Sequence, residues 1–225
     1  ARTTNELREW LIGENHTTTT RLSGLNRRLE GLISDDKQAI DLVENILVAA
    51  HQLPGANWDQ RIFKKKPSGI TEKFLTLIHQ HIYQKNPARG FEYDLEADTY
   101  ALPPELLTNS YKLQIALHKL LQPLRQLTKW LETNLKKSIV PVDNQSHSRV
   151  ETLIRAINQN GINQITAWQA MLGDLETGSS QQFIDWFSIK RFLGYDNDVG
   201  LHRNWINPMK PFVDTVIKPA HGVLI

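Results

Sequence analysis

The segment 113–131, LQIALHKLLQPLRQLTKWL, indicates the fold of this 225-residue chain more clearly than any other stretch. Leucines recur in it at alternating spacings of four and three residues: Leu113, Leu117, Leu120, Leu124, Leu127 and Leu131. This repeat places them in one stripe along a helix and is typical of helices that pack nearly parallel or antiparallel to one another. Pro123 lies within the stripe, where we expect a kink that leaves the buried face unchanged. The segment therefore predicts a long helix inside a helical bundle.

Local patterns predict five further helices around this segment. Thr3 and Glu6 form a capping-box pattern at the start of the first, which ends at Ile12. The others run from about Thr18 to Ile33, from a cap at Ser34 to Pro54-Gly55, from Ile70 to Asn86-Pro87, and from Ser148 towards Leu172 with an interruption at Asn160-Gly161. Together these segments predict an antiparallel helical bundle.

The pattern changes after Gly178. Apolar residues then alternate with polar ones, which predicts two strands joined through Gly194–Asp198. The apolar side of the first strand carries Phe183, Phe187 and Ile189, and that of the second carries Val199, Leu201 and Trp205. A short apolar segment, 212–217, and a final apolar strand, 222–225, follow; the strand has no polar finish, so we expect the chain to be a piece of a longer protein. The predicted fold class is mainly α: a helical domain over residues 1–178, followed by a small β-hairpin and strand segment over residues 179–225.

Composition limits the classes of function. Apolar residues make up 40% of the chain and charged residues 22%, so the chain can bury a core of its own. It has no cysteine, which excludes disulfides, thiolate zinc sites, iron–sulfur ligation and a cysteine nucleophile in these residues. The formal net charge is +2, so a nucleic-acid surface has to come from local clustering. The longest apolar stretch, Ile46–Ala50, is too short for a membrane span, and we expect a cytoplasmic protein.

One cluster suits nucleic-acid binding: Trp58, Arg61, Lys64, Lys65 and Lys66. Three consecutive ammonium groups on a loop can follow phosphates, and a nearby indole offers a base a flat face on which to stack. A solvated charge run is the alternative interpretation. Arg27-Arg28 and Lys136-Lys137 are weaker candidates, and the second pair is better explained by its place at the negative end of a helix dipole.

No other residues form a convincing site. His79 and His81 are two apart on a predicted helix, so their side chains diverge and cannot share a metal ion. Asp94, Glu96, Asp98 and Glu105 imitate the ligand spacing of a calcium loop, but Thr99 occupies the position that needs glycine. We therefore expect an acidic loop or edge strand there. No spacing singles out catalytic residues.

The C-terminal segment carries a family resemblance. Residues 198–208, DVGLHRNWINP, then Pro211-Phe212, then 218–225, KPAHGVLI, resemble the segment of DinG-like and XPD-like superfamily 2 DNA helicases just before their third motif. In that family the apolar strand runs directly into a Thr-Ser-Ala-Thr-Leu sequence, and this chain ends one residue short of it. The resemblance covers about the last forty residues; for the preceding helices it extends only to their position and helical character.

The resemblance implies that the helices correspond to the Arch-like insert between the D-E-A-H box and the third motif. Members of the family unwind DNA with 5′ to 3′ polarity using ATP, and the Arch helps to enclose the single strand. This chain has neither a G-x-x-x-x-G-K-[ST] loop nor a D-E-A-H box, so ATP and magnesium would bind other parts of the parent protein. Whether the parent carries an iron–sulfur cluster stays open, because the family's four cysteines are absent here.

The expected function is therefore that of an accessory DNA-guiding domain, which contacts single-stranded DNA weakly and in a salt-dependent way beside the rest of the helicase chain. The alternative is a helical interaction module that docks a repair or replication partner without touching DNA. A free-standing helical adaptor is a third hypothesis. The sequence leaves the oligomeric state open.

Overall fold

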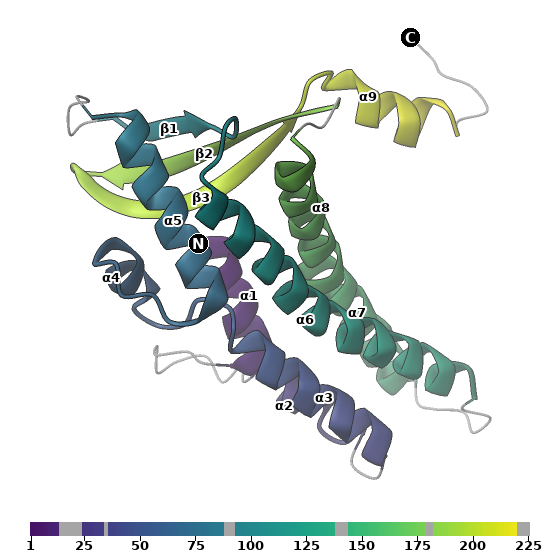
Figure 1. The fold of residues 1–225 in the computed structure, drawn as a ribbon. Coiled ribbons are helices and arrows are strands. Elements are labelled where there is room, and N and C mark those ends of the chain that lie inside the picture. Colours follow the sequence, from purple (N-terminus) through teal and green to yellow (C-terminus); the bar gives the residue numbers. More distant parts are fainter. Residues whose placement is uncertain (14–23, 34–35, 88–92, 138–143, 179–181, 220–225) are drawn as a thin grey trace.

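The structure is a computed structural model that describes residues 1–13, 24–33, 36–87, 93–137, 144–178 and 182–219 (Figure 1). Its elements, in chain order, are α1 (Arg2–Ile12), α2 (Leu25–Leu29), α3 (Lys37–Ala50), α4 (Trp58–Phe63), α5 (Gly69–Lys85), β1 (Leu95–Asp98), α6 (Pro104–Lys137), α7 (Asn144–Ile157), α8 (Asn163–Thr177), β2 (Phe183–Phe192), β3 (Tyr195–Trp205) and α9 (Met209–Phe212). Two π-helical turns, η1 (Asn158–Ile162) and η2 (Val213–Ile217), follow α7 and α9. The predicted mainly helical class is confirmed.

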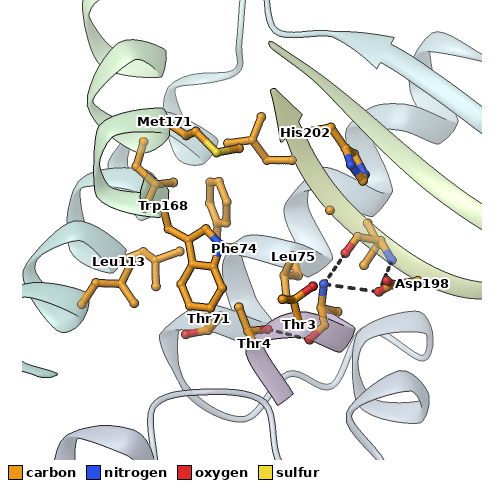
Figure 2. A pocket seen from close by; sticks show the side chains of 16 residues that line it. Thr3, Thr4, Thr71, Phe74, Leu75, Leu113, Trp168, Met171, Asp198 and His202 are labelled. Atoms are coloured by element: carbon orange, nitrogen blue, oxygen red, sulfur yellow. Dashed lines mark hydrogen bonds and ion pairs between the residues drawn. The ribbon is translucent and has the colours of Figure 1, made fainter. Parts of the chain in front are cut away.

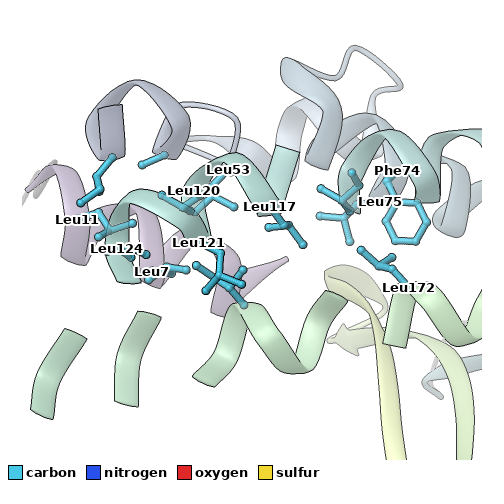
Figure 3. Close-up of a cluster of buried hydrophobic side chains, with 14 of the residues drawn as sticks. Leu7, Leu11, Leu53, Phe74, Leu75, Leu117, Leu120, Leu121, Leu124 and Leu172 are labelled. Carbon is cyan, nitrogen blue, oxygen red and sulfur yellow. The ribbon is translucent and has the colours of Figure 1, made fainter. Parts of the chain in front are cut away.

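Helix α6 is the central element, as the leucine repeat predicted. All six predicted leucines are buried in the core, and α6 packs against α3, α5, α7 and α8. The helix continues through Pro123, which is itself buried. Figure 3 shows Leu117, Leu120, Leu121 and Leu124 of α6 among leucines of α1 and α8. The 4–3 spacing thus aligns one apolar stripe that several neighbours cover.

The N-terminal helices depart from their predicted ends. Helix α1 ends at Ile12 as predicted, but it begins at Arg2, so Thr3 lies inside it and the predicted capping box is wrong. In the described part of the segment 18–33, only Leu25–Leu29 is α-helical; the helix ends at Glu30, whose ψ of 130° is extended, and Gly31 follows in a left-handed conformation at φ +79°. Helix α3 is capped by Asp36, whose carboxylate accepts the Ala39 N–H at 3.0 Å; Ser34 lies outside the described residues.

The helices predicted from Ile70 and from Ser148 are confirmed as α5 and as α7 followed by α8. Helix α5 buries Phe74, Ile78 and Ile82 on one face. The interruption predicted at Asn160-Gly161 is the π-helical turn η1, which joins α7 to α8 without breaking the helical path. Among the described helices, none combines the length and apolar character needed to cross a membrane.

Three antiparallel strands form a sheet in the order β1-β2-β3. The predicted hairpin is confirmed, but its turn is shorter than predicted: Leu193-Gly194 forms the turn, and Tyr195, Asp196 and Asp198 already pair within β3, with a bulge at Asn197. The acidic segment forms edge strand β1, with Glu96 and Asp98 exposed and Leu95 and Ala97 buried. Trp205, expected in the core, instead lies 37% exposed at the end of β3, packed on Phe183.

The sheet and the helices share one core. Phe187, Ile189 and Val199 of the hairpin belong to the same buried cluster as the leucines of α6, and α5 packs against all three strands. The described residues on both sides of the predicted boundary at residue 178 therefore pack as one unit. Residues 212–217 are helical, and the predicted strand 222–225 lies outside the described residues.

Candidate nucleic-acid interface

Lys64, Lys65 and Lys66 form the C-terminal cap of helix α4, and all three are exposed. The Lys65 N–H donates to the Ile62 carbonyl at 3.1 Å and the Lys66 N–H donates to the Arg61 carbonyl at 2.8 Å. This pair of bonds defines a Schellman cap, in which the left-handed position is usually glycine but here is Lys65, at φ +58°. This cap ends helix α4 in a turn from which three consecutive lysines project into solvent.

Arg61 and Glu72 clamp this cap to α5. The Arg61 guanidinium donates to both Glu72 carboxylate oxygens, at 2.8 and 2.5 Å, and to the Ala56 carbonyl at 2.6 Å. The Glu72 side chain is only 1% exposed and also accepts the Ser68 N–H at 2.7 Å. The hydrogen bond to Glu72 raises the pKa of Arg61 above its ordinary value. Because Arg61 is engaged inside the loop, we assign it to positioning the lysines, a role that the sequence did not predict.

The lysines themselves have weak partners or none in the described part of the chain. The Lys64 ammonium lies 3.5 Å from the Gln60 side-chain oxygen, and no carboxylate pairs with Lys64, Lys65 or Lys66 there. Exposed lysines without an acidic partner keep their charge available for phosphates. The geometry therefore separates the predicted cluster into one clamped arginine and three available cations, which we call the lysine cap.

Trp58 is partly buried and packs edge-on against Phe63, with ring centroids 6.2 Å apart. It also contacts the core, so the predicted stacking face is largely used by the protein itself. Phe63 continues the aromatic contacts to His79, at 5.2 Å between centroids, and His79 continues them to Tyr83, at 4.9 Å. A row of rings thus leads from the lysine cap along α5.

The row ends in a polar network beneath the β2–β3 turn. Asp196 accepts a hydrogen bond from the Tyr83 hydroxyl at 2.9 Å and lies 2.8 Å from His79 Nε2 and 3.1 Å from Arg191 Nε. Arg191 Nη2 also donates to the Tyr83 hydroxyl at 2.7 Å. Burial raises the pKa of Asp196, but hydrogen bonds from His79, Tyr83 and Arg191 outweigh it and hold that pKa below its ordinary value. These bonds fix the base of the hairpin turn to α5.

The turn itself exposes apolar side chains that the sequence interpretation overlooked. Phe192 is 67% exposed, Leu193 81% and Tyr195 79%. Leu193 at φ +49° and Gly194 at φ +80° give a type I′ turn, in which asparagine or glycine usually occupies the first position. A left-handed leucine costs roughly 1–2 kcal/mol, and its exposure in water brings no burial energy in return. In the sequence, the Leu193-Gly194 pair between two alternating segments is the feature that could have indicated this turn.

The other predicted candidates lie elsewhere. Arg28 stacks over the Trp10 ring at 5.6 Å, while Arg27 and Lys136 are exposed. His79 pairs with Asp196 and His81 packs edge-on against Phe187, so the two histidines diverge as predicted. Among the described residues, no group of three or more metal-ligating side chains could hold an ion.

A separate cavity of about 170 Å³ lies between α1, α5, α6, α8 and β3 (Figure 2). Phe74, Leu75, Trp168 and Met171 form much of its wall, and His202 lies at its edge. Burial lowers the pKa of His202, which favours the neutral ring, and its Nε2 lies 2.8 Å from the buried Ser188 hydroxyl. These walls are mainly apolar, and a chemically reactive set does not converge on them.

Comparisons with known proteins do not assign a function to the chain, so a functional proposal has to rest on the geometry described above. No family model, curated protein or solved structure matches the chain.

Proposed function

We propose that this chain is an accessory module of a DinG/XPD-like DNA helicase and that its lysine cap contacts the backbone of single-stranded DNA. The observation that carries the proposal is the clamp: Arg61 and the buried Glu72 hold Lys64, Lys65 and Lys66 at the surface. The ion pair between Arg61 and the buried Glu72 fixes the loop that carries the lysines, and this fixed geometry supports the proposal over a merely solvated charge run. Three positioned cations suit a run of phosphates.

The module would leave the chemistry to other domains. The chain carries neither a phosphate-binding glycine loop nor a D-E-A-H box, so ATP and magnesium would be bound by the motor domains of the parent. In this arrangement the lysine cap guides the strand while the motor moves it. No residue of this chain is assigned to catalysis.

An exposed apolar face at the C-terminal end favours contact with another part of the helicase. Its residues are Ile206, Met209, Phe212 and Val216, each between 48% and 56% exposed. Apolar clusters of this kind usually mark an interaction surface. The same face supports the second candidate function, a module that docks a repair or replication partner without contacting DNA.

Titration of a fluorescently labelled single strand distinguishes these functions. The test variant replaces Lys64, Lys65 and Lys66 by glutamine, and the control variant replaces Lys112, Lys119 and Lys129, exposed lysines of α6. We expect the test variant to bind roughly ten-fold or more weakly at about 50 mM salt, and the control to bind nearly as the original chain does. Equal affinities for both variants would refute the lysine cap. Failure of the original chain to bind the single strand at about 50 mM salt would favour the docking function.

A further inference from the structure

We propose that the tip of the β2–β3 hairpin, formed by Phe192, Leu193 and Tyr195, stacks against unpaired bases and so makes this module selective for single strands over duplexes. This inference rests on the proposed function, because the lysine cap would hold the backbone of the same strand. In this inference the lysine cap contacts the phosphates of the strand, and the hairpin tip contacts its bases.

The composition of the tip suits bases. Phe192 and Tyr195 are paired across the two strands, and they are 67% and 79% exposed. Aromatic rings stack on every base through its π-face, whatever the sequence. Leu193, between them, occupies a left-handed position that asparagine would fill without strain. Backbone strain combined with an exposed apolar side chain is a feature that persists at functional sites.

The tip is held in place before any ligand arrives. Asp196 and Arg191, which directly flank the tip, are bonded to each other and to Tyr83 of α5, and Asp196 also bonds His79. Arg191 stacks over the Tyr83 ring at 5.6 Å. A surface fixed by such a network loses little freedom on binding, which favours affinity.

The tip and the lysine cap lie at the same end of the molecule. Figure 1 shows α4 and the β2–β3 turn on one side, and α4 packs against β3. Consecutive centres from Phe63 through His79 and Tyr83 to Arg191 are 5.2, 4.9 and 5.6 Å apart. These contacts connect the helix that carries the lysine cap to the base of the hairpin tip.

Charge at the tip does not oppose a phosphate backbone. Asp196 is neutralised by Arg191, and Asp94, the next carboxylate along the sheet edge, pairs with Lys190 at 2.9 Å. The lysine cap adds three positive charges at this end of the molecule, where Asp59 of α4 and Glu96 of β1 are also exposed. In a duplex, bases are paired and stacked inside, so only an unpaired strand can present phosphates to the lysines and base faces to the tip together.

The test compares single-stranded and duplex DNA of one sequence, with 2-aminopurine in the single strand as a reporter of stacking. We expect Tyr195→Ala to weaken single-strand binding about five- to ten-fold, to leave duplex binding unchanged and to reduce the change in 2-aminopurine fluorescence. Tyr195→Phe, which keeps the ring, should restore both signals. Tyr111→Ala, which removes an exposed tyrosine of α6, is the matched control and should change neither.

The variant Leu193→Asn separates a loss of binding from a loss of folding. Asparagine suits the left-handed position, so this variant should melt at the same or a higher temperature while binding the single strand more weakly. If Tyr195→Ala and Leu193→Asn bind the single strand as the original chain does, while the lysine-cap variant loses binding, the inference fails and the proposed function stands. If the original chain binds no single strand, both fail.

Discussion

Replacing Arg61 by methionine should destabilise the chain markedly, because it leaves the Glu72 carboxylate buried without its cation. Glu72 is 1% exposed and would lose two charge-assisted hydrogen bonds, while the Ser68 N–H remains. Removing one partner of a buried ion pair costs about 3–5 kcal/mol. Since the Arg61 side chain is 31% exposed, water can reach the site, and the lower end, about 3 kcal/mol, applies.

Urea denaturation monitored by circular dichroism measures the change in the free energy of unfolding. In a thermal scan, a loss of about 3 kcal/mol should lower the melting temperature by roughly 6–12 °C. The double variant Arg61→Met, Glu72→Leu replaces the pair by apolar side chains of similar size. It should be more stable than Arg61→Met alone, because no unpaired charge remains buried. A loss below about 1 kcal/mol for Arg61→Met, or strictly additive effects of the two changes, would show that the pair does not clamp the lysine cap.

Three further outcomes follow from the structure. Lys65→Gly should raise the free energy of unfolding by about 0.5–1 kcal/mol in urea, because glycine suits the left-handed cap position, and should weaken single-strand binding; a loss of stability would contradict the Schellman geometry. Leu124→Ala should cost about 2–5 kcal/mol in the same assay, whereas Ile115→Ala, on the exposed side of α6, should change stability by less than about 0.5 kcal/mol. The folded pKa of Asp196 lies below its ordinary value of 3.8, so its contribution is present above pH 3.8 and disappears as pH falls through the folded pKa. Acid titrations monitored by circular dichroism should therefore show a smaller loss of stability below pH 4 in Asp196→Asn than in the original chain, and equal losses would count against the network.

The sequence sufficed for elements whose residues repeat at one period. The leucines of α6 and the apolar residues of α5 lie on single faces, so periodicity alone located both helices and their buried sides. The alternation in β2 and β3 likewise predicted the hairpin. Helix α4 escaped prediction because six residues are too few to establish a period, and α2 is shorter than predicted because the backbone becomes extended at Glu30.

The candidate interface was only half predictable. Lys64, Lys65 and Lys66 stand together in the sequence, so their clustering was visible. Arg61 meets Glu72, eleven residues away, through a turn of the chain whose geometry no residue spacing specifies. His79 and Asp196 are 117 residues apart, so tertiary packing alone brings them together. For the same reason, the exposed hairpin tip could be recognised only once its neighbours were placed.

The central claim is that the lysine cap contacts phosphates of a single strand. The most direct measurement is the dependence of single-strand affinity on salt concentration, for the original chain and for the variant with glutamine at Lys64, Lys65 and Lys66. Each lost phosphate contact should reduce the slope of log affinity against log salt by about 0.7, so the variant should be shallower by about 2. Parallel lines for the two proteins would contradict the account.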